Sequence, residues 1–187
     1  GGRSFRKSTS RGNRNTEAEI KAGRKVMRAA GDDANKAMEP IYKKMGYRDR
    51  DELARHLDRT LVPLTEKWHV EFGLEIFEQS GLYYPGTLVV GDNICASNNM
   101  CGVTIGFSDF EGAGAYRHAG DYHSHPSSTG KGFSYNDILA MYGHMGEDYV
   151  SYVSSAYYPL VALDLAKYSG WSESHMYHSA KPRVVGE

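Results

Sequence analysis

The chain lacks the features of a membrane protein and of a small domain held together by disulfides. Only two of its 187 residues are cysteines, Cys95 and Cys101. They could close a loop in an oxidising compartment or remain thiols in a reducing one. Because there is no Cys-x-x-Cys pair, a zinc site built from thiolates is not expected. No apolar run approaches membrane-spanning length.

The beginning of the chain also lacks the hydrophobic core of a Sec signal peptide. That lack excludes neither a piece cut from a longer precursor nor export by another route. What is present, 40% hydrophobic and 24% charged residues, is typical of a soluble globular protein. A length of 187 residues fits one domain of ordinary size, and no internal repeat is visible.

The net charge of −1 hides an asymmetry along the chain. Residues 1–60 carry 16 Lys and Arg against 9 Asp and Glu, whereas residues 61–187 carry 6 against 14. The basic third could contact nucleic acid or acidic lipid, or it could lie against the acidic remainder. Acidic residues are interleaved with these cations, and no aromatic stacking residues accompany them. We therefore interpret the cations as side chains on the solvated faces of helices, and we do not expect nucleic-acid binding.

Three segments are predicted along the chain. Residues 1–15 are polar, basic and aperiodic, and are expected to be a flexible linker or a processed end. Residues 16–62 are expected to be helical. Residues 63–187 alternate bulky and charged residues between turn signals and are expected to form the sheet-bearing core.

Within the helical segment, capping-box patterns at Thr16-x-x-Glu19 and Asp49-x-x-Glu52 predict two helix starts. Gly31 and the acids after it are expected to interrupt the first helix near Ala30, and Pro40 to kink or break the following run. The helix after Asp49 is expected to be short.

Within the core, strands are expected over 68–77, 82–84, 87–90, 103–107, 120–125, 149–154 and 160–165, with a helix from Ser134 to about Tyr142. The predicted fold class is therefore α+β: a helical N-terminal region followed by a mixed, mostly antiparallel sheet flanked by helices.

The most informative segment runs from Asp121 to Asp137. His123 and His125 are separated by one residue, so on a strand their side chains point to the same face and can bind one metal ion. Asp137 would be a third ligand. Three protein ligands with a fourth position open for water are typical of a catalytic zinc site.

Hydrolysis at such a metal needs two further groups. Glu71, on a predicted strand in Val70-Glu71-Phe72-Gly73, is the candidate general base. Ser134, at the start of the helix that carries Asp137, is the candidate to stabilise an oxyanion. Ser-x-x-Asp is equally an acidic variant of the capping box, so Ser134 could be only an N-cap.

This set of residues resembles the motif of the JAB/JAMM metalloproteases: a strand Glu, then His-x-His-Pro, then Ser-x-x-Asp. The matching residues are Glu71, His123-Ser124-His125-Pro126 and Phe133-Ser134-Tyr135-Asn136-Asp137, and the resemblance covers roughly residues 66–167. It implies a Zn2+ ion held by His123, His125 and Asp137, with Glu71 as general acid/base and Ser134 at the oxyanion. Eight residues separate His125 from Ser134, one more than usual, so the loop is expected to bulge.

More narrowly, Glu-Phe-Gly, Tyr-His-Ser-His and Phe-Ser-x-x-Asp resemble an uncharacterised JAB-like domain at the carboxyl ends of bacterial Rhs-type polymorphic toxins. This implies a zinc metallopeptidase or isopeptidase that is a secreted effector acting in a target cell. A peptide or protein substrate and a cognate immunity protein are implied as partners. Two alternatives remain open: a catalytically silent binding module of the same fold, and a metal-dependent nuclease toxin.

Other candidates carry ordinary explanations. His118 could line a substrate channel, but a surface-loop histidine is expected. His175 and His178 could share a helix face, but are expected to be solvated. The tyrosines in two pairs, Tyr83 with Tyr84 and Tyr157 with Tyr158, are expected to be packing residues with wet hydroxyls.

Overall fold

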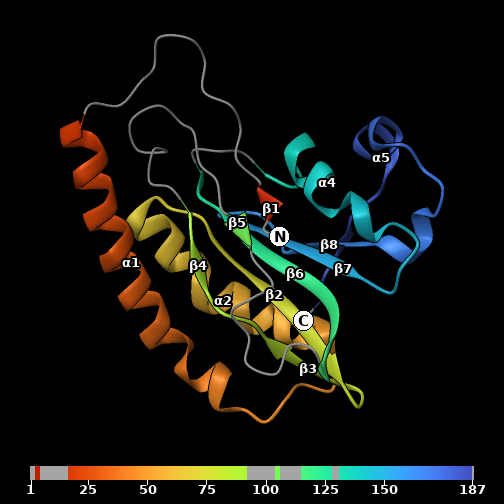
Figure 1. Ribbon diagram of the computed structural model, residues 1–187, viewed down its shortest axis with the longest axis horizontal. Coiled ribbons are helices and arrows are strands. Elements are labelled where there is room, and N and C mark those ends of the chain that lie inside the picture. The colour runs from red at the N-terminus through yellow and green to blue at the C-terminus, as the bar shows by residue number, and fades with distance from the viewer. Residues whose placement is uncertain (1–2, 5–16, 92–103, 106–114, 128–130, 187) are drawn as a thin grey trace.

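The computed structural model describes residues 3–4, 17–91, 104–105, 115–127 and 131–186 (Figure 1). The capping box expected at Thr16, both cysteines and most of residues 1–15 lie outside the described residues. In the described part of the chain, no helix combines the length and apolarity needed to cross a membrane.

Two long helices come first, α1 (Glu17–Lys43) and α2 (Arg50–Trp68). The predicted helix start at Asp49 is confirmed: Asp49 is the N-cap of α2, and its side chain accepts a hydrogen bond from the Asp51 backbone N–H rather than from that of Glu52. The predicted break at Gly31 is wrong, because α1 continues through it. A Cβ at Gly31 would lie 3.2 Å from Val90 Cγ2, so the glycine permits close approach to a strand.

Proline does not end either helix. Pro40 lies inside α1 and Pro63 inside α2, so the break allowed for at Pro40 and the short length expected for α2 are both wrong. The buried helix faces explain the difference, because packing of an apolar face outweighs local propensity. The α1 and α2 residues buried in the core include Ala30, Ala34, Met38, Ile41, Leu53, Leu57 and Leu61.

The described strands form a seven-stranded sheet and a separate pair. The sheet contains β2 (Phe72–Gln79), β3 (Leu82–Pro85), β4 (Val89–Val90), β6 (Arg117–His125), β7 (Val150–Ser155), β8 (Val161–Asp164) and β9 (Arg183–Val184). Its order is β3-β2-β6-β7-β8-β9, with β4 also pairing with β2. Only the β6–β7 pair is parallel among these strands. The separate pair is β1 (Arg3–Ser4) with β5 (Thr104–Ile105).

The sheet lies between two layers of helix, with α1 and α2 on one side and α4 (Tyr135–Met141) and α5 (Glu173–Ser179) on the other (Figure 1). On the α2 side, Leu74, Ile76, Tyr122 and Tyr152 share one core with the first helices. On the other side, a smaller core contains Ile138, Met141 and Met176. The predicted α+β fold class is confirmed.

One boundary differs from the prediction where the helical region meets the sheet. A strand was expected from Trp68, but Trp68 ends α2, and β2 begins at Phe72. The Trp68 indole N–H donates to Asp33 of α1 at 2.9 Å, a contact that fixes the two helices together. Local alternation could not reveal this bond because its partners are 35 residues apart.

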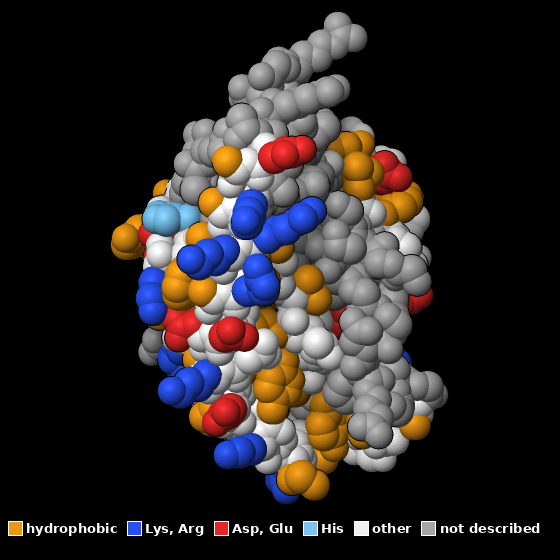
Figure 2. Space-filling view, turned by 60° about the vertical axis from the view of Figure 1, so that its left-hand side comes forward, with side chains coloured by type: hydrophobic (Ala, Val, Ile, Leu, Met, Phe, Trp, Pro, Cys, Tyr) orange, Lys and Arg blue, Asp and Glu red, His pale blue; other side chains and the backbone are white. Residues whose placement is uncertain are grey.

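The exposed face of α1 carries a group of the basic side chains of the N-terminal region. Figure 2 shows Lys and Arg side chains gathered on this face, with acidic side chains around them. The exposed cations of the first turns are Lys21, Arg24, Lys25 and Arg28.

Candidate metal centre

The central strand β6 supplies two of the expected ligands. His123 and His125 are two residues apart on this strand, so both point to the sheet face opposite α2. Their rings are 4.7 Å apart between centroids, and their Nε2 atoms are 3.1 Å apart. Both side chains are buried. The period-two prediction for this pair is confirmed.

The third expected ligand, Asp137, lies in the first turn of α4. Ser134 is the N-cap of this helix and forms a capping box with Asp137. The Ser134 hydroxyl accepts from the Asp137 N–H at 3.1 Å, and Asp137 Oδ2 accepts from the Ser134 N–H at 2.8 Å. A carboxylate is favourable there because helix N-termini carry partial positive charge.

The three ligand groups converge. Asp137 Oδ2 lies 3.2 Å from His123 Nε2 and 3.6 Å from His125 Nε2. One donor atom from each of the three residues lies within 4.8 Å of the others, and all three are buried. The chain between His125 and Ser134, one residue longer than the usual spacing of the motif that it resembles, therefore still allows Asp137 to reach both histidines. Part of that loop, residues 128–130, lies outside the described residues.

The carboxylates around the three side chains favour positive charge at this place, as the pKa shifts of His123 and Asp137 show. Burial alone would lower the pKa of His123, but the carboxylates of Asp137, Glu71 and Asp121 outweigh it and raise that pKa to about 9. Burial alone would raise the pKa of Asp137, but the two histidines and the Ser134 N–H lower it below its usual value. In metal-free protein the pocket therefore retains a proton on His123 opposite a charged Asp137.

Glu71 joins the group from the residue immediately before β2. Its Oε1 lies 3.5 Å from His125 Nε2, and its side chain is buried. The structure thus brings the predicted base beside the predicted ligands, although it precedes the strand and was expected within it.

On the sheet face opposite the candidate ligands, a buried pair of hydroxyl groups connects strands β2 and β6 with α2. Ser124, between the two histidines, points to the opposite sheet face, where its Oγ lies 2.6 Å from Thr65 Oγ1 of α2. The same Oγ accepts from the Phe72 N–H at 3.0 Å. Because Phe72 follows Glu71, this bond ties the position of Glu71 to that of the histidines.

Asp121 extends the polar row along the site face of β6. It is buried and accepts hydrogen bonds from the Tyr149 hydroxyl and from Ser151 Oγ, the latter at 2.5 Å. The period-two rule that selected His123 and His125 also places Asp121 on their face, so the sequence contained a signal for it.

The expectation of a surface-loop position for His118 is wrong. It lies on β6, largely buried, with its Nε2 3.5 Å from Glu75 Oε1 and its ring 5.1 Å from that of Tyr149. The register of β2 and β6 shifts between Ile76 and Phe77, which turns His118 toward the face of Asp121. An irregularity of this kind leaves no clear trace in the sequence pattern.

The solvated positions expected for His175 and His178 on α5 are confirmed by their exposure. The expectation for the second tyrosine pair is wrong. Tyr157 is 86% exposed and Tyr158 is 51% exposed, so neither is a core packing residue.

Comparisons of the chain with models of protein families, with curated proteins and with solved structures gave no match. The chemical meaning of the site therefore comes from its own donor set. Two imidazole nitrogens and a carboxylate oxygen are donors that zinc and other divalent transition metals accept. His123, His125 and Asp137 form a buried group that could hold a metal ion.

Proposed function

We propose that the protein is a zinc-dependent metallohydrolase of the JAB/JAMM type that cleaves a peptide or isopeptide bond. One observation carries the proposal: a buried His-His-Asp donor set has the Glu71 carboxylate 3.5 Å from one of its histidines. A metal-ligand set with an adjacent carboxylate is the minimum arrangement for metal-assisted hydrolysis.

The donor set fits zinc in number and type. Three protein ligands leave one tetrahedral position for water or substrate, as in catalytic sites. When bound, zinc would lower the pKa of water and polarise the carbonyl under attack. The raised pKa of His123 belongs to the metal-free protein, since a ligating imidazole must be neutral.

The roles of the remaining residues follow from their positions. Glu71 is buried beside His125, where its carboxylate can hold a proton and deliver it to a leaving amine. Ser134 uses its oxygen lone pair to cap α4, and its hydroxyl hydrogen remains able to donate to a developing oxyanion. Capping and oxyanion stabilisation are therefore compatible roles for one side chain.

The proposed biological setting rests on the resemblance of the motifs to the JAB-like domain of bacterial Rhs-type toxins. A hydrolase of this type at the carboxyl end of a secreted bacterial toxin would act in a target cell and require an immunity protein in the producing cell. In the alternative of a metal-dependent nuclease, the exposed Lys and Arg side chains of α1 would contact the nucleic acid. No described aromatic residue accompanies those cations.

A single substitution separates the enzyme from a silent binding module. Glu71→Gln removes the base but none of the three metal ligands, so the variant is expected to retain zinc and lose at least a hundredfold in cleavage rate. The probes are a peptide library from a digested proteome and a set of lysine-linked isopeptides, with new termini counted by mass spectrometry.

The matched control is Glu66→Gln, which changes an α2 carboxylate that binds the Ser127 N–H at 2.7 Å and is not part of the donor set. Equal cleavage by wild type and Glu71→Gln would refute the role of Glu71. Chelator-sensitive cleavage of plasmid or RNA, with no peptide cleavage, would favour the nuclease instead.

A further inference from the structure

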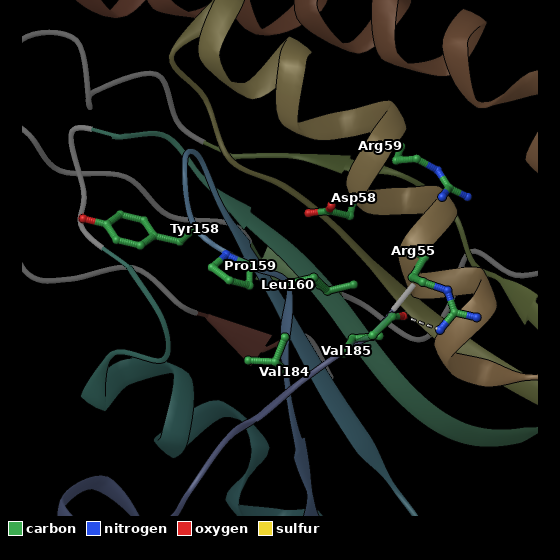
Figure 3. Close-up of a pocket in the computed structure, with 9 residues that line it drawn as sticks. Arg55, Asp58, Arg59, Tyr158, Pro159, Leu160, Val184 and Val185 are labelled. Carbon is green, nitrogen blue, oxygen red and sulfur yellow. Dashed lines mark hydrogen bonds between the residues drawn. The ribbon is translucent and has the colours of Figure 1, made fainter.

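The sheet separates the metal group from a pocket on its α2 side. That pocket has a volume of about 390 Å³, and its lining includes Arg55, Asp58 and Arg59 of α2 (Figure 3). Asp58 accepts a hydrogen bond from Ser154 Oγ of β7 at 2.6 Å, so the pocket lies against the sheet face opposite the candidate ligands. A substrate therefore has to approach the metal group from the α4 side of the sheet.

A short pair of strands lies on the α4 side. Strand β1 pairs with β5, while β5 also contacts β2 and β1 contacts α4. Glu71 immediately precedes β2, and Asp137 lies in the first turn of α4. Figure 1 shows the pair in front of the sheet, with β1 next to α4. The pair therefore spans the space between two of the elements that border the metal group.

The path of the chain makes β1 a tethered segment. Helix α1 covers the opposite face of the sheet, yet β1, which precedes α1, lies on the α4 side (Figure 1). Residues 5–16 connect the two elements. A short tether raises the local concentration of the attached segment to the order of millimolar. A ladder of two residue pairs is weak by itself, but a tethered strand can occupy it and can leave it again.

Charge favours the same placement. Residues 1–16 contain five Lys or Arg and no Asp or Glu. The carboxylates of Glu71, Asp121 and Asp137 lie in or beside the metal group, and residues 61–187 as a whole carry 14 acidic against 6 basic residues. A basic segment is attracted to this acidic part of the molecule, and salt weakens the attraction. The amino-terminal strand thus lies against the acidic remainder of the chain.

We propose that the amino-terminal strand is a reversible inhibitor of the protein's own metal site. While β1 is paired with β5, it covers the approach to the metal group from the α4 side, and a peptide substrate has to displace it. The inhibition rests on the metallohydrolase function proposed above, whereas the covering of the site does not.

The position of β1 is tested by a disulfide in the full chain. In the register of the pair Ser4 lies opposite Thr104, a separation that a disulfide spans. Ser4→Cys with Thr104→Cys, in a chain that also carries Cys95→Ser and Cys101→Ser, is expected to form this disulfide on mild oxidation in chelator. The control replaces Thr104→Cys by Ser80→Cys, in the exposed turn between β2 and β3, and is expected to cross-link at least about tenfold more slowly.

The effect of closure is measured on the same cross-linked protein. Its oxidised form holds β1 on β5, and reduction followed by alkylation of both thiols releases the strand. The oxidised form is expected to take up zinc, and to cleave the peptide library, at least about tenfold more slowly than the released form, because only the open site admits metal or substrate. A colorimetric indicator follows zinc uptake, and mass spectrometry counts the new termini.

A second pair of variants tests the inhibition without added cysteines. Arg3→Pro with Ser4→Pro removes both backbone N–H groups of β1, whichever of them donates to β5. This variant is expected to cleave the library about three- to tenfold faster than Arg3→Ala with Ser4→Ala, which loses the same side chains but keeps both N–H groups.

The outcomes separate this proposal from the proposed function. Equal rates for the oxidised and released forms, or a control disulfide at Ser80→Cys that forms as readily, would overturn the inhibitory strand and leave the metallohydrolase untouched. No cleavage by the released form would refute the proposed function, and slower zinc uptake by the oxidised form would then still support the covered site. Absence of zinc uptake by both forms would refute both.

Discussion

At the scale of single residues, His123 binds a proton in the place where it would bind a metal. Its pKa is raised to about 9 in the metal-free protein, against about 6.5 for an unfolded histidine. The folded state therefore holds this proton more tightly than the unfolded state. The resulting stability is fully present below pH 6.5 and is lost as the pH rises through 9.

The free energy of unfolding of the metal-free protein is accordingly expected to fall between pH 6.5 and 9, by on the order of 2–3 kcal/mol. Metal affinity is expected to rise over the same interval, because metal displaces the proton. Urea denaturation in chelator and calorimetric zinc titration measure the two trends. His123→Gln is the reference, and the same pH profile in that variant would contradict the assignment.

Some of these residues are predictable from the sequence and others are not. His123, His125 and Asp137 follow from local rules, the period of a strand and a capping box. Thr65 does not, because its role depends on which sheet face α2 covers, and His118 does not, because a register shift reorients it.

At the scale of elements, α2 supports the site from behind the sheet. The Thr65–Ser124 hydroxyl pair and the Ser124–Phe72 bond link this helix to the strands bearing His123, His125 and Glu71. The candidate ligands lie on the other sheet face. Their arrangement therefore depends on a helix that contributes none of the three candidate ligands.

Thr65→Val, which keeps the shape and removes the hydroxyl, is expected to cost about 1–2 kcal/mol of stability. It is also expected to weaken zinc binding roughly tenfold, as loss of supporting hydrogen bonds does at other metal sites. Thr65→Ser retains the hydroxyl and is expected to keep wild-type zinc affinity. Calorimetric titration with zinc measures the affinity of both variants. Equal zinc affinities would show that the Thr65–Ser124 pair does not position the candidate ligands.

The element boundaries show where local sequence rules fail. Gly31, Pro40 and Pro63 are helix breakers by intrinsic preference, yet the helices continue through them. Their apolar faces pack against a sheet built from later parts of the chain, and that energy is invisible in a local pattern. Strands β6, β7 and β8 were predicted to within a few residues because turns flank them and their composition is β-forming.

At the scale of the whole molecule, hydrogen bonds and ion pairs connect β9 to α2. Arg183 of β9 donates to Asp51 of α2 at 2.6 and 2.9 Å and to Asp164 of β8 at 2.7 Å. Asp51 also accepts from the Tyr152 hydroxyl of β7. This partly exposed network connects α2 with strands β7, β8 and β9.

Arg183→Gln is expected to destabilise the protein by about 1–2 kcal/mol, since solvent screens part of the ion pairing. This corresponds to a melting temperature lower by roughly 2–8 °C. Lys181→Gln, which changes an exposed neighbour outside the network, is the control. Differential scanning calorimetry measures both, and equal melting temperatures would contradict a role for the network.

The metal content of the purified protein tests the central claim most directly. After expression with added zinc and dialysis, mass spectrometry of the elements is expected to find about one zinc per wild-type chain. It is expected to find almost none in His123→Gln or Asp137→Asn, with circular dichroism confirming that both variants fold. Metal-free wild-type protein, or variants that retain as much zinc as wild type, would contradict the account.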